Sequence, residues 1–411
     1  MLLTATAHAQ DSLLTYMAAA VEANPKVQAA WQSYQSAAQA VCQAGTLGDP
    51  ELTVGWYPKP MQLVNGEQIA TFGIMQMFPW FGSMKAAREE KDWQTRSMYE
   101  NYRAVGIDVA FAVEQKWYEI LTTQEQMHAI EQNIAYLKQI QETAIYQYKT
   151  AQAGMKKGNL SDQLRLESEA LGLQEQLETA QTRLTLQRQQ LNLLMHRDVH
   201  SPVVLPDSIV LRQMPLVDFS DIEQASPELA AIRDEQSSLQ STVEKNRKSG
   251  MPKIGLGAQY MLNGEVDAPR MADMNGNDMW MAQLKLTLPI YRRKTNSAVR
   301  QAQLQQNAAQ ERYAGVKDDL QSEWLSILQR ADEQQRSIRL LTQQLDLLDR
   351  TLALMQTEYA VAATSLTDLL DTDRQRVSLS LRLAEAKARY NTTVAEMERL
   401  AALYAPKSNE K

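Results

Sequence analysis

The sequence predicts a mainly α-helical chain with transmembrane β-strands, built as a duplicated helix–strand–strand–helix unit. Three observations predict this fold class. Two segments of about 70 residues each lack proline and are rich in helix-forming residues. Proline and glycine breaks recur at a nearly constant distance along the chain. Short segments between these breaks alternate apolar and polar residues, which is typical of strands with one apolar face.

The chain repeats itself. Pro25 and Pro227, which each open a helical stretch, are 202 positions apart. The run Asn-Leu-Ser-Asp at 159–162 recurs as Ser-Leu-Thr-Asp at 365–368, 206 positions later. A repeat of this length is a duplicated structural unit rather than a short solenoid repeat. We expect a first repeat over 10–205 and a second over 206–403, followed by a flexible tail at 404–411.

Residues 1–9 resemble the end of a secretory signal peptide. An apolar run is followed by Ala7-His8-Ala9, which matches a small-x-small cleavage site. The basic segment that usually precedes such a run is missing, which leaves open whether the natural chain begins further upstream. The alternative is an ordinary frayed terminus.

In the first repeat we expect a helix, strands at about 51–58 and 68–78, a long helix over 84–157, a turn and another helix. Val109, Val113 and Trp117 recur at helical spacing in the long helix. At 1.5 Å per residue this helix would extend about 110 Å, which is wider than a globular domain. The shorter helices at 12–45 and 161–196 together are about as long. Stacked end to end, they would complete a cylinder wall of uniform height.

The second repeat carries the clearest strand pattern. We expect strands at about 253–262 and 279–288 and a long helix over 296–363. Along the last strand Trp280, Leu284 and Leu288 share one face, whereas Gln283 and Lys285 lie on the other. A soluble sheet packed on a core is one interpretation. Lipid is the other partner for such a face, and three chains would supply the twelve strands of a closed barrel.

Composition narrows the function classes. The net charge of −7 argues against a nucleic-acid-binding protein, which would carry a basic surface. The single cysteine, Cys42, cannot form an internal disulfide. The sequence shows no nucleophile–base pair, phosphate-binding loop or metal-ligand spacing, so we do not expect an enzyme or a bound cofactor. A periplasmic coiled-coil adaptor or scaffold without a membrane barrel is the alternative.

These features resemble the TolC family of outer-membrane efflux proteins over about 12–403. The resemblance is carried by the duplicated element order, by Pro79-Trp80-Phe81-Gly82 after a strand, and by the run Ser-Leu-Thr-Asp-Leu-Leu-Asp at 365–371. It implies a homotrimer in the outer-membrane lipid of a Gram-negative bacterium, with a twelve-stranded β-barrel and an α-helical barrel that crosses the periplasm. It also implies a passive exit duct that works with an inner-membrane efflux pump and a periplasmic adaptor protein. The exported substrate is not identified by it.

The resemblance implies an acidic ring at the periplasmic entrance, formed by Asp368 and Asp371. These residues lie three apart, so one helical face carries both. Six carboxylates of a trimer in a narrow pore would favour cations. The alternative is that they complement the dipole of a helix whose N-cap is Ser365 or Thr367. Both interpretations can hold together.

Other entrance residues are also implied by the resemblance. Asp162 and Tyr359 match a pair that holds the entrance closed, although Tyr359 could simply pack in the tunnel wall. This chain has Thr364 where the family prototype has an arginine partner, so the lock is weaker here or built differently. The turns expected to be exposed and to contact the adaptor contain Gly158, Asn159, Leu160, Ser161, Thr364, Ser365 and Leu366.

Two weaker patterns concern metals. His196 and His200 are spaced for one helix face, but Pro202 follows closely, so a surface position near a helix end is the alternative. Methionine thioethers are soft ligands that suit Cu(I), although methionine also fills gaps adaptably. The segment 76–82 resembles the branch of the family typified by CzcC and CusC, which exports heavy-metal ions. The candidate methionines are Met271, Met274, Met279 and Met281, with Met75, Met77 and Met84 in the first repeat.

Overall fold

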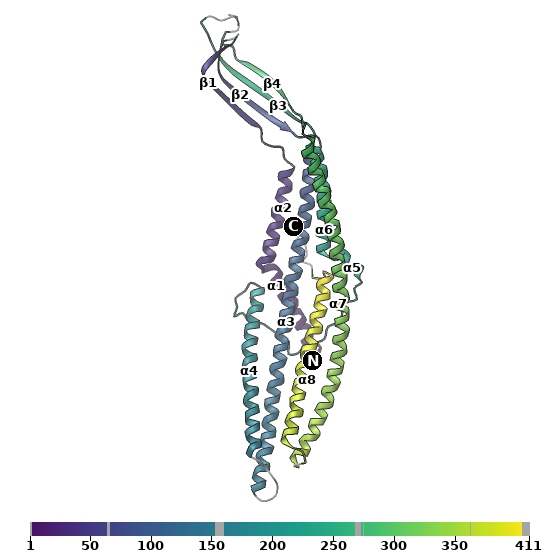
Figure 1. The fold of residues 1–411 in the computed structure, drawn as a ribbon. Helices are drawn as coiled ribbons and strands as arrows, with labels where there is room; N and C mark the ends of the chain where they lie inside the picture. The colour runs from purple at the N-terminus through teal and green to yellow at the C-terminus, as the bar shows by residue number, and fades with distance from the viewer. Residues whose placement is uncertain are drawn as a thin grey trace. The chain divides into compact units, whose positions relative to one another are not determined.

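The computed structural model describes residues 2–63, 66–152, 160–267, 273, 275–361 and 363–404. Its elements follow the order helix, helix, strand, strand, long helix, helix, and this order occurs twice (Figure 1). The first series contains α1 (Leu2–Ala23), α2 (Pro25–Ala44), β1 (Glu51–Leu63), β2 (Gly66–Phe78), α3 (Ser83–Gln152) and α4 (Leu160–Leu194). The second contains α5 (Phe219–Ala225), α6 (Pro227–Ser249), β3 (Lys253–Gly264), β4 (Met279–Thr287), α7 (Arg292–Ala360) and α8 (Leu366–Leu400).

Local chemistry explains where the first helices meet. Pro25 occupies the first turn of α2, where its missing N–H costs nothing. The side-chain oxygen of Asn24 accepts a hydrogen bond from the backbone N–H of Lys26 at 2.9 Å. The amide nitrogen of the same side chain donates to the carbonyl of Leu194 at 2.8 Å. Asn24 therefore caps the start of α2 and the end of α4 together.

The chain divides into two compact units, and each takes elements from both halves of the sequence. Unit 1 comprises the described residues of Met1–Ala30, Tyr102–Pro227 and Lys317–Lys411. Unit 2 comprises those of Trp31–Asn101 and Glu228–Val316. The expected division into repeats at residue 205 stays a prediction.

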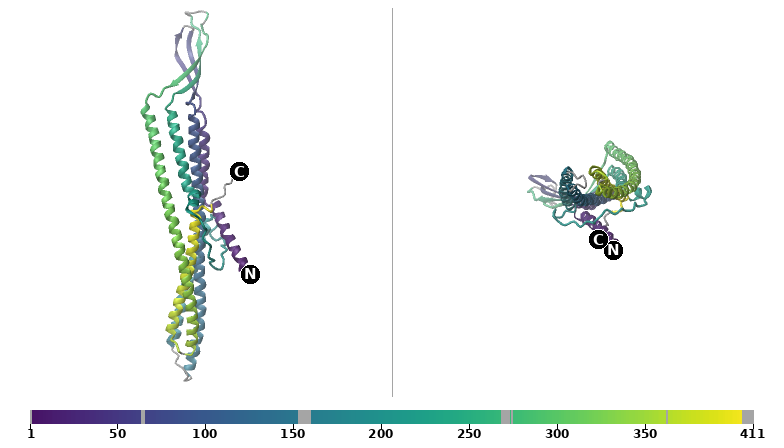
Figure 2. Two further views of the ribbon diagram at one scale, coloured as in Figure 1. Left: turned by 90° about the vertical axis from the view of Figure 1, so that its right-hand side faces the viewer. Right: turned by 90° about the horizontal axis from the view of Figure 1, so that it is seen from below.

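Unit 1 is a bundle in which α3, α4, α7 and α8 share a core. Near the turns that join the helix pairs, one buried cluster takes Ile140 from α3, Leu166 from α4, Leu352 from α7 and Leu369 from α8. A second cluster packs α1 against α3 and α4 around Trp117, whose ring lies 5.8 Å from that of Tyr16. Figure 2 shows these helices from below. Apolar burial on all four helices therefore holds the bundle together.

A buried ionic network ties the connection between α4 and α5 to the same bundle. The guanidinium of Arg212 pairs with the carboxylates of Glu114 on α3 and Glu398 on α8. It also donates to the hydroxyl of Tyr404 at 3.1 Å. Glu114 is fully buried, and one of its carboxylate oxygens has no hydrogen-bond partner. Burial raises the pKa of Glu114 to about 7, although the Arg212 charge acts in the opposite direction.

The helices of unit 2 form a single layer in the order α2, α3, α6, α7. Tyr34 of α2 packs on Tyr99 of α3, with ring centroids 5.4 Å apart. Glu90 of α3 accepts a hydrogen bond from Thr242 of α6 at 3.0 Å. The side chain of Asn246 on α6 donates to the α7 carbonyl of Ala298 at 3.2 Å. Both outer helices of this layer, α2 and α7, thus have one side without a neighbouring helix among the described elements.

The sheet of unit 2 is antiparallel throughout, in the order β1-β2-β3-β4. Residues directly opposite each other in such a sheet point to the same face. The pairs Leu52–Ile74, Phe72–Tyr260 and Leu256–Leu284 therefore place apolar side chains from all four strands on one face. The even-numbered positions of 254–262 and 279–286 follow the same pattern, so the alternation expected for the second repeat is present.

Three expectations about element bounds need correction. The second long helix, α7, covers Arg292–Ala360 rather than 296–363. β1 continues to Leu63 rather than ending near residue 58, because the pairing with β2 shifts between Trp56 and Met61 and so accommodates Pro58 and Pro60. α4 ends at Leu194, before the expected end at 196. Within the described residues, none of the helices is both long and apolar enough to cross a membrane.

The network around Arg212 predicts an unusual pH dependence. Between its ordinary value of 4.5 and the folded-state value of about 7, Glu114 holds a proton in the folded protein that the unfolded chain has lost. The free energy of unfolding should therefore fall as pH rises through this window, relative to Glu114→Gln. Thermal unfolding of both proteins at several pH values checks this. Glu142→Gln, an exposed acid of α3, controls for loss of a carboxylate. A stability difference that does not vary with pH would contradict the account.

Candidate functional site

The turn between α7 and α8 brings together most of the predicted site residues. Ser365 is the N-cap of α8, and its hydroxyl accepts a hydrogen bond from the backbone N–H of Asp368 at 3.2 Å. The same hydroxyl donates to the Asp368 carboxylate at 2.6 Å. Thr364 donates to the Glu358 carboxylate at 2.7 Å. Ser365, rather than Thr367, is therefore the cap, and Asp368 lies where its charge complements the helix dipole.

Asp371 lies one turn further along and shares a basic partner. The guanidinium of Arg374 donates to the Asp371 carboxylate at 3.1 Å. It also makes two hydrogen bonds, at 3.0 and 2.6 Å, to the carboxylate of Glu169 on α4. These bonds hold the pKa of Glu169 below its ordinary value. Asp371 is thus an exposed carboxylate whose charge Arg374 partly offsets.

A second contact joins the same two helices. Arg165 of α4 donates to the hydroxyl of Thr367 on α8 at 2.8 Å. An arginine is therefore present near this turn, although this chain has Thr364 at the position where the family prototype has its arginine. This arginine, Arg165, lies on α4, and Thr364 instead makes a hydrogen bond to Glu358. Sequence reasoning missed Arg165, Glu169 and Arg374. Their one available signal is the i, i+4 spacing of Arg165 and Glu169, which puts both on one face of α4.

Tyr359 lies within electrostatic range of Asp162. Tyr359 is only 5% exposed and packs in the cluster that contains Leu352 and Leu369. Burial raises the pKa of Tyr359 to about 12, and the charge of Asp162 adds to this effect. Tyr359 therefore packs in the bundle core, and its hydroxyl is also affected by the charge of Asp162. Whether the pair holds an entrance closed stays a prediction.

The turns expected to contact an adaptor differ from one another. Ser161 and Ser365 are exposed, but Leu366 is 4% exposed and buried beside Tyr359. The expectation that Leu366 is exposed is therefore wrong, because its side chain points into the bundle core. Val361, which is 65% exposed, is the large apolar side chain that the described residues of this turn present. Gly158 and Asn159 lie outside the described residues, as does the side chain of Leu160.

A buried acid near this end was not predicted from the sequence. Asp373 is 2% exposed and accepts two hydrogen bonds from Arg376, at 3.2 and 3.1 Å. The Arg376 guanidinium lies 5.8 Å from the ring centre of Tyr136 on α3. Burial raises the pKa of Asp373 against the effect of this arginine. The contacts link α8 to α3 just beyond the Arg374–Glu169 pair.

The structure bears differently on the two candidate metal-binding patterns, the histidine pair and the methionines. α4 ends at Leu194 and His196 has a left-handed backbone (φ 51°), so His196 and His200 do not share a helix face. Among the described residues, no group of three or more His, Cys, Asp or Glu side chains is arranged to hold a metal ion. Met279 and Met281 lie on β4. Met271 and Met274 fall outside the described residues.

Comparisons with known proteins agree on one kind of molecule. The family described as outer membrane efflux protein matches residues 219–403. Among solved structures, CusC, studied for folding and transmembrane channel formation, is 16% identical over 95% of this chain and 92% of its own, with a TM-score of 0.78. The outer membrane protein VceC of Vibrio cholerae is 15% identical over 96% and 97%, with a TM-score of 0.76. The open-state outer membrane channel MtrE of Neisseria gonorrhoeae is 16% identical over 95% and 89%, with a TM-score of 0.72. No curated protein sequence matches.

The cap geometry predicts separable effects at the start of α8. Ser365→Ala removes the acceptor for the Asp368 N–H and should lower the free energy of unfolding by about 1 kcal/mol. Asp371→Asn should change it less, because the Asp371–Arg374 pair is exposed on both sides. Denaturant unfolding of the two variants and the wild type checks the order. Equal stability of Ser365→Ala and the wild type would contradict the assigned cap.

Proposed function

We propose that this chain, whose residues 219–403 match the outer membrane efflux protein family, is one subunit of a trimeric outer-membrane channel that forms the exit duct of a tripartite efflux system. The family match confirms the resemblance identified from the sequence. The fold shared with CusC, VceC and MtrE confirms the predicted class of long helices with a small antiparallel sheet. The matched family and the similar structures are channels rather than enzymes.

The observation that carries the proposal is the apolar face of the sheet, which is exposed in the single chain. Leu52, Trp56, Trp280 and Leu284 are each more than 70% exposed, although they belong to paired strands. Within unit 2, none of the described helices lies over this face (Figure 1). A continuous apolar surface across four strands needs an apolar environment, because water is a poor solvent for it. Membrane lipid supplies that environment.

Aromatic residues lie toward both ends of this face. Trp56, Tyr260 and Trp280 occupy one end, where Tyr260 and Trp280 are directly paired. Phe78 occupies the other, and the exposed Phe81 follows in the turn after β2. Rings of aromatic residues at both membrane interfaces are typical of transmembrane β-strands. The strands are 13, 13, 12 and 9 residues long, and about 9–11 residues suffice to cross a bilayer.

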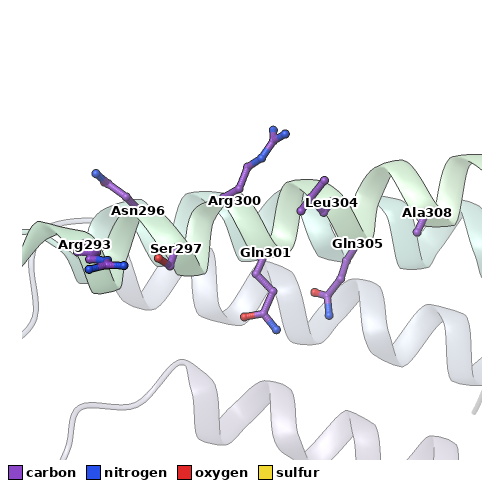
Figure 3. A pocket seen from close by; sticks show the side chains of 8 residues that line it. All are labelled: Arg293, Asn296, Ser297, Arg300, Gln301, Leu304, Gln305 and Ala308. Carbon is purple, nitrogen blue, oxygen red and sulfur yellow. The ribbon is translucent and has the colours of Figure 1, made fainter.

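Open edges support assembly from several copies. β1 and β4 each have one unpaired edge in the sheet order, and unpaired backbone groups are not tolerated in lipid. The helical layer is open at the helices that adjoin these two strands in the chain, because α2 precedes β1 and α7 follows β4. An open groove of about 850 Å³ runs along α7 (Figure 3), and it is lined by α7 residues alone, all of them exposed. These include Arg293, Ser297, Arg300, Leu304 and Ala308.

Three copies would satisfy both layers at once. Twelve strands can close a barrel, and α7 of one copy would lie beside α2 of the next. The odd-numbered face of the sheet, which carries Thr71, Gln259, Gln283 and Lys285, would then line a water-filled lumen. The outer membrane of a Gram-negative bacterium is the corresponding location.

The α7–α8 turn is the proposed periplasmic entrance. Asp368 and Asp371 would form its acidic ring, and Asp162 with Tyr359 would help to hold it closed. The contacts Arg165–Thr367 and Arg374–Glu169 hold α4 against α8 and so add to that closure. A periplasmic adaptor would dock on the exposed turn and connect the duct to an inner-membrane pump. No observation favours the coiled-coil scaffold alternative.

Assembly tests the proposal first. Detergent-solubilised protein should have about three times the mass of one chain by light scattering, because only closure removes the strand edges. A scaffold protein would instead leave the membrane fraction in high salt without detergent. A monodisperse monomer that still conducts ions in a bilayer would contradict the trimer.

Entrance charge can be read from single-channel recordings. Asp368→Ala combined with Asp371→Ala should reduce cation preference and relieve block by a trivalent hexammine ion. Arg374→Gln should do the reverse, because it frees the Asp371 and Glu169 carboxylates from their shared partner. Block should weaken as ionic strength rises. Identical selectivity in all three proteins would remove both acids from the conducting path.

Adaptor docking depends on the exposed part of the turn. Val361→Asp should abolish efflux in cells while leaving the trimer intact, because a charge would replace the apolar side chain presented to the adaptor. Leu216→Asp, at a fully exposed residue of the connection before α5, is the matched control and should leave efflux unchanged. Efflux that survives Val361→Asp places the docking surface elsewhere.

A further inference from the structure

Methionine is segregated to one face of the sheet. Over the regularly paired residues 51–56, 70–78, 254–262 and 279–286, the strand register places every methionine at an odd-numbered position, on the face opposite the apolar one. This methionine face carries Met75, Met77, Met261, Met279 and Met281.

The two faces of the sheet differ in which apolar residues they carry. Over the same paired residues, the methionine face has no leucine, isoleucine, valine, phenylalanine or tryptophan, and the opposite face has no methionine. If these positions only filled space, leucine would serve as well as it does on the other face. The remaining residues of the methionine face are glycines and polar residues. The choice of methionine among them therefore points to the thioether sulfur rather than to apolar volume.

Two of the sulfur atoms converge on one point. A side-chain carbon built on Gly255 of β3 would lie 2.6 Å from the Met77 sulfur and 3.1 Å from the Met75 sulfur. Both side chains therefore reach from β2 over the backbone of β3. Gly257, the direct partner of Met75, leaves room for the same side chain, whose sulfur lies 3.0 Å from its missing carbon. The two glycines leave the space over β3 that the two thioethers occupy.

The surrounding charges are mixed. Glu51, which is exposed, is directly paired with Met75 across β1 and β2, so it lies on the same face as the two sulfurs. Lys285 is directly paired with Gly255 on the other side. Further along the face, Gln283 donates to Gln259 at 2.5 Å and separates this pair from the second methionine group. In that group Met261 faces Met279 directly, and Met281 is two residues along β4.

We propose that Met75 and Met77 form a two-sulfur site over Gly255 for a soft monovalent cation, Cu(I) or Ag(I). Thioethers bind such ions and discriminate against Na⁺, K⁺ and Mg²⁺, which require oxygen ligands. Met261, Met279 and Met281 provide a second thioether group on the same face. The position of this face in a channel lumen rests on the proposed function, whereas cation binding by the sheet does not.

Silver binding to the purified full chain in detergent tests the site, because Ag(I) is stable to oxidation. All proteins carry Cys42→Ser, since the exposed free thiol of Cys42 would otherwise bind silver. Met75→Leu with Met77→Leu keeps the apolar volume but removes both sulfurs, and should weaken binding at this site by about tenfold or more. Met98→Leu, an exposed methionine of α3, is the matched control and should bind as the parent does.

A second measurement separates ligation from packing. In protein labelled with ¹³C on the methionine methyl groups, the Met75 and Met77 signals should shift on addition of Ag(I) and not on addition of K⁺. Gly255→Ala retains both methionines but places a methyl group between their sulfurs, so it should also weaken binding. Unchanged silver affinity in the double leucine variant, or unshifted Met75 and Met77 signals, would overturn the proposal. Light scattering on the same samples reports separately whether the trimer has formed.

Discussion

The constraint on which the rest of the structure depends is the apolar face of a four-stranded sheet that nothing else in the described chain covers. Trp280 and Leu284 of β4 and Leu52 of β1 belong to one surface that reaches from edge to edge. In water such a surface would promote aggregation, and in lipid its two free edges would leave backbone groups unpaired. Both costs are removed only if further copies continue the sheet until it closes. Membrane insertion and oligomerisation are therefore one requirement rather than two.

The helical part meets a different requirement. Unit 1 has its own buried clusters, and the network of Arg212, Glu114 and Glu398 ties the connection between the two halves of the chain to that core. Near the α7–α8 turn, α4 and α8 are joined by exposed polar contacts as well as by the buried cluster. Arg374–Glu169 and Arg165–Thr367 lie on the surface, where ion pairs and hydrogen bonds contribute little to stability. Under the proposed function, weak, exposed links between α4 and α8 suit an entrance that opens, whereas the buried clusters of unit 1 suit a rigid wall.

Much of the fold could be predicted from the sequence because its signals are local or periodic. Alternation in 279–288 identified the strand and its apolar face, and the long runs without proline identified α3 and α7. The continuation of β1 to Leu63 could not be predicted. Pro58 and Pro60 indicate the end of a strand in the sequence, whereas in the structure a register shift against β2 lets the strand continue past them. Arg165, Glu169 and Arg374 were missed because their contacts join residues about 200 positions apart. The burial of Leu366 was missed because a turn position does not reveal which way a side chain points. The methionine face needed the register of all four strands, since the methionines of β2 and β4 are far apart in the sequence.

The most direct measurement of the central claim is cross-linking between the free edges of the sheet in intact outer membranes. One cysteine is placed on β1, at Glu51 or Thr53, and one on β4, at Gln283 or Lys285, in chains that carry Cys42→Ser. All four positions lie on the face that would line the lumen. A disulfide forms only when the two α-carbons approach within about 7 Å. The account predicts that at least one combination gives a covalent trimer, and that chains carrying either cysteine alone do not. Chains that remain monomeric in every combination, in membranes where the protein is inserted, would contradict closure of the sheet by neighbouring copies.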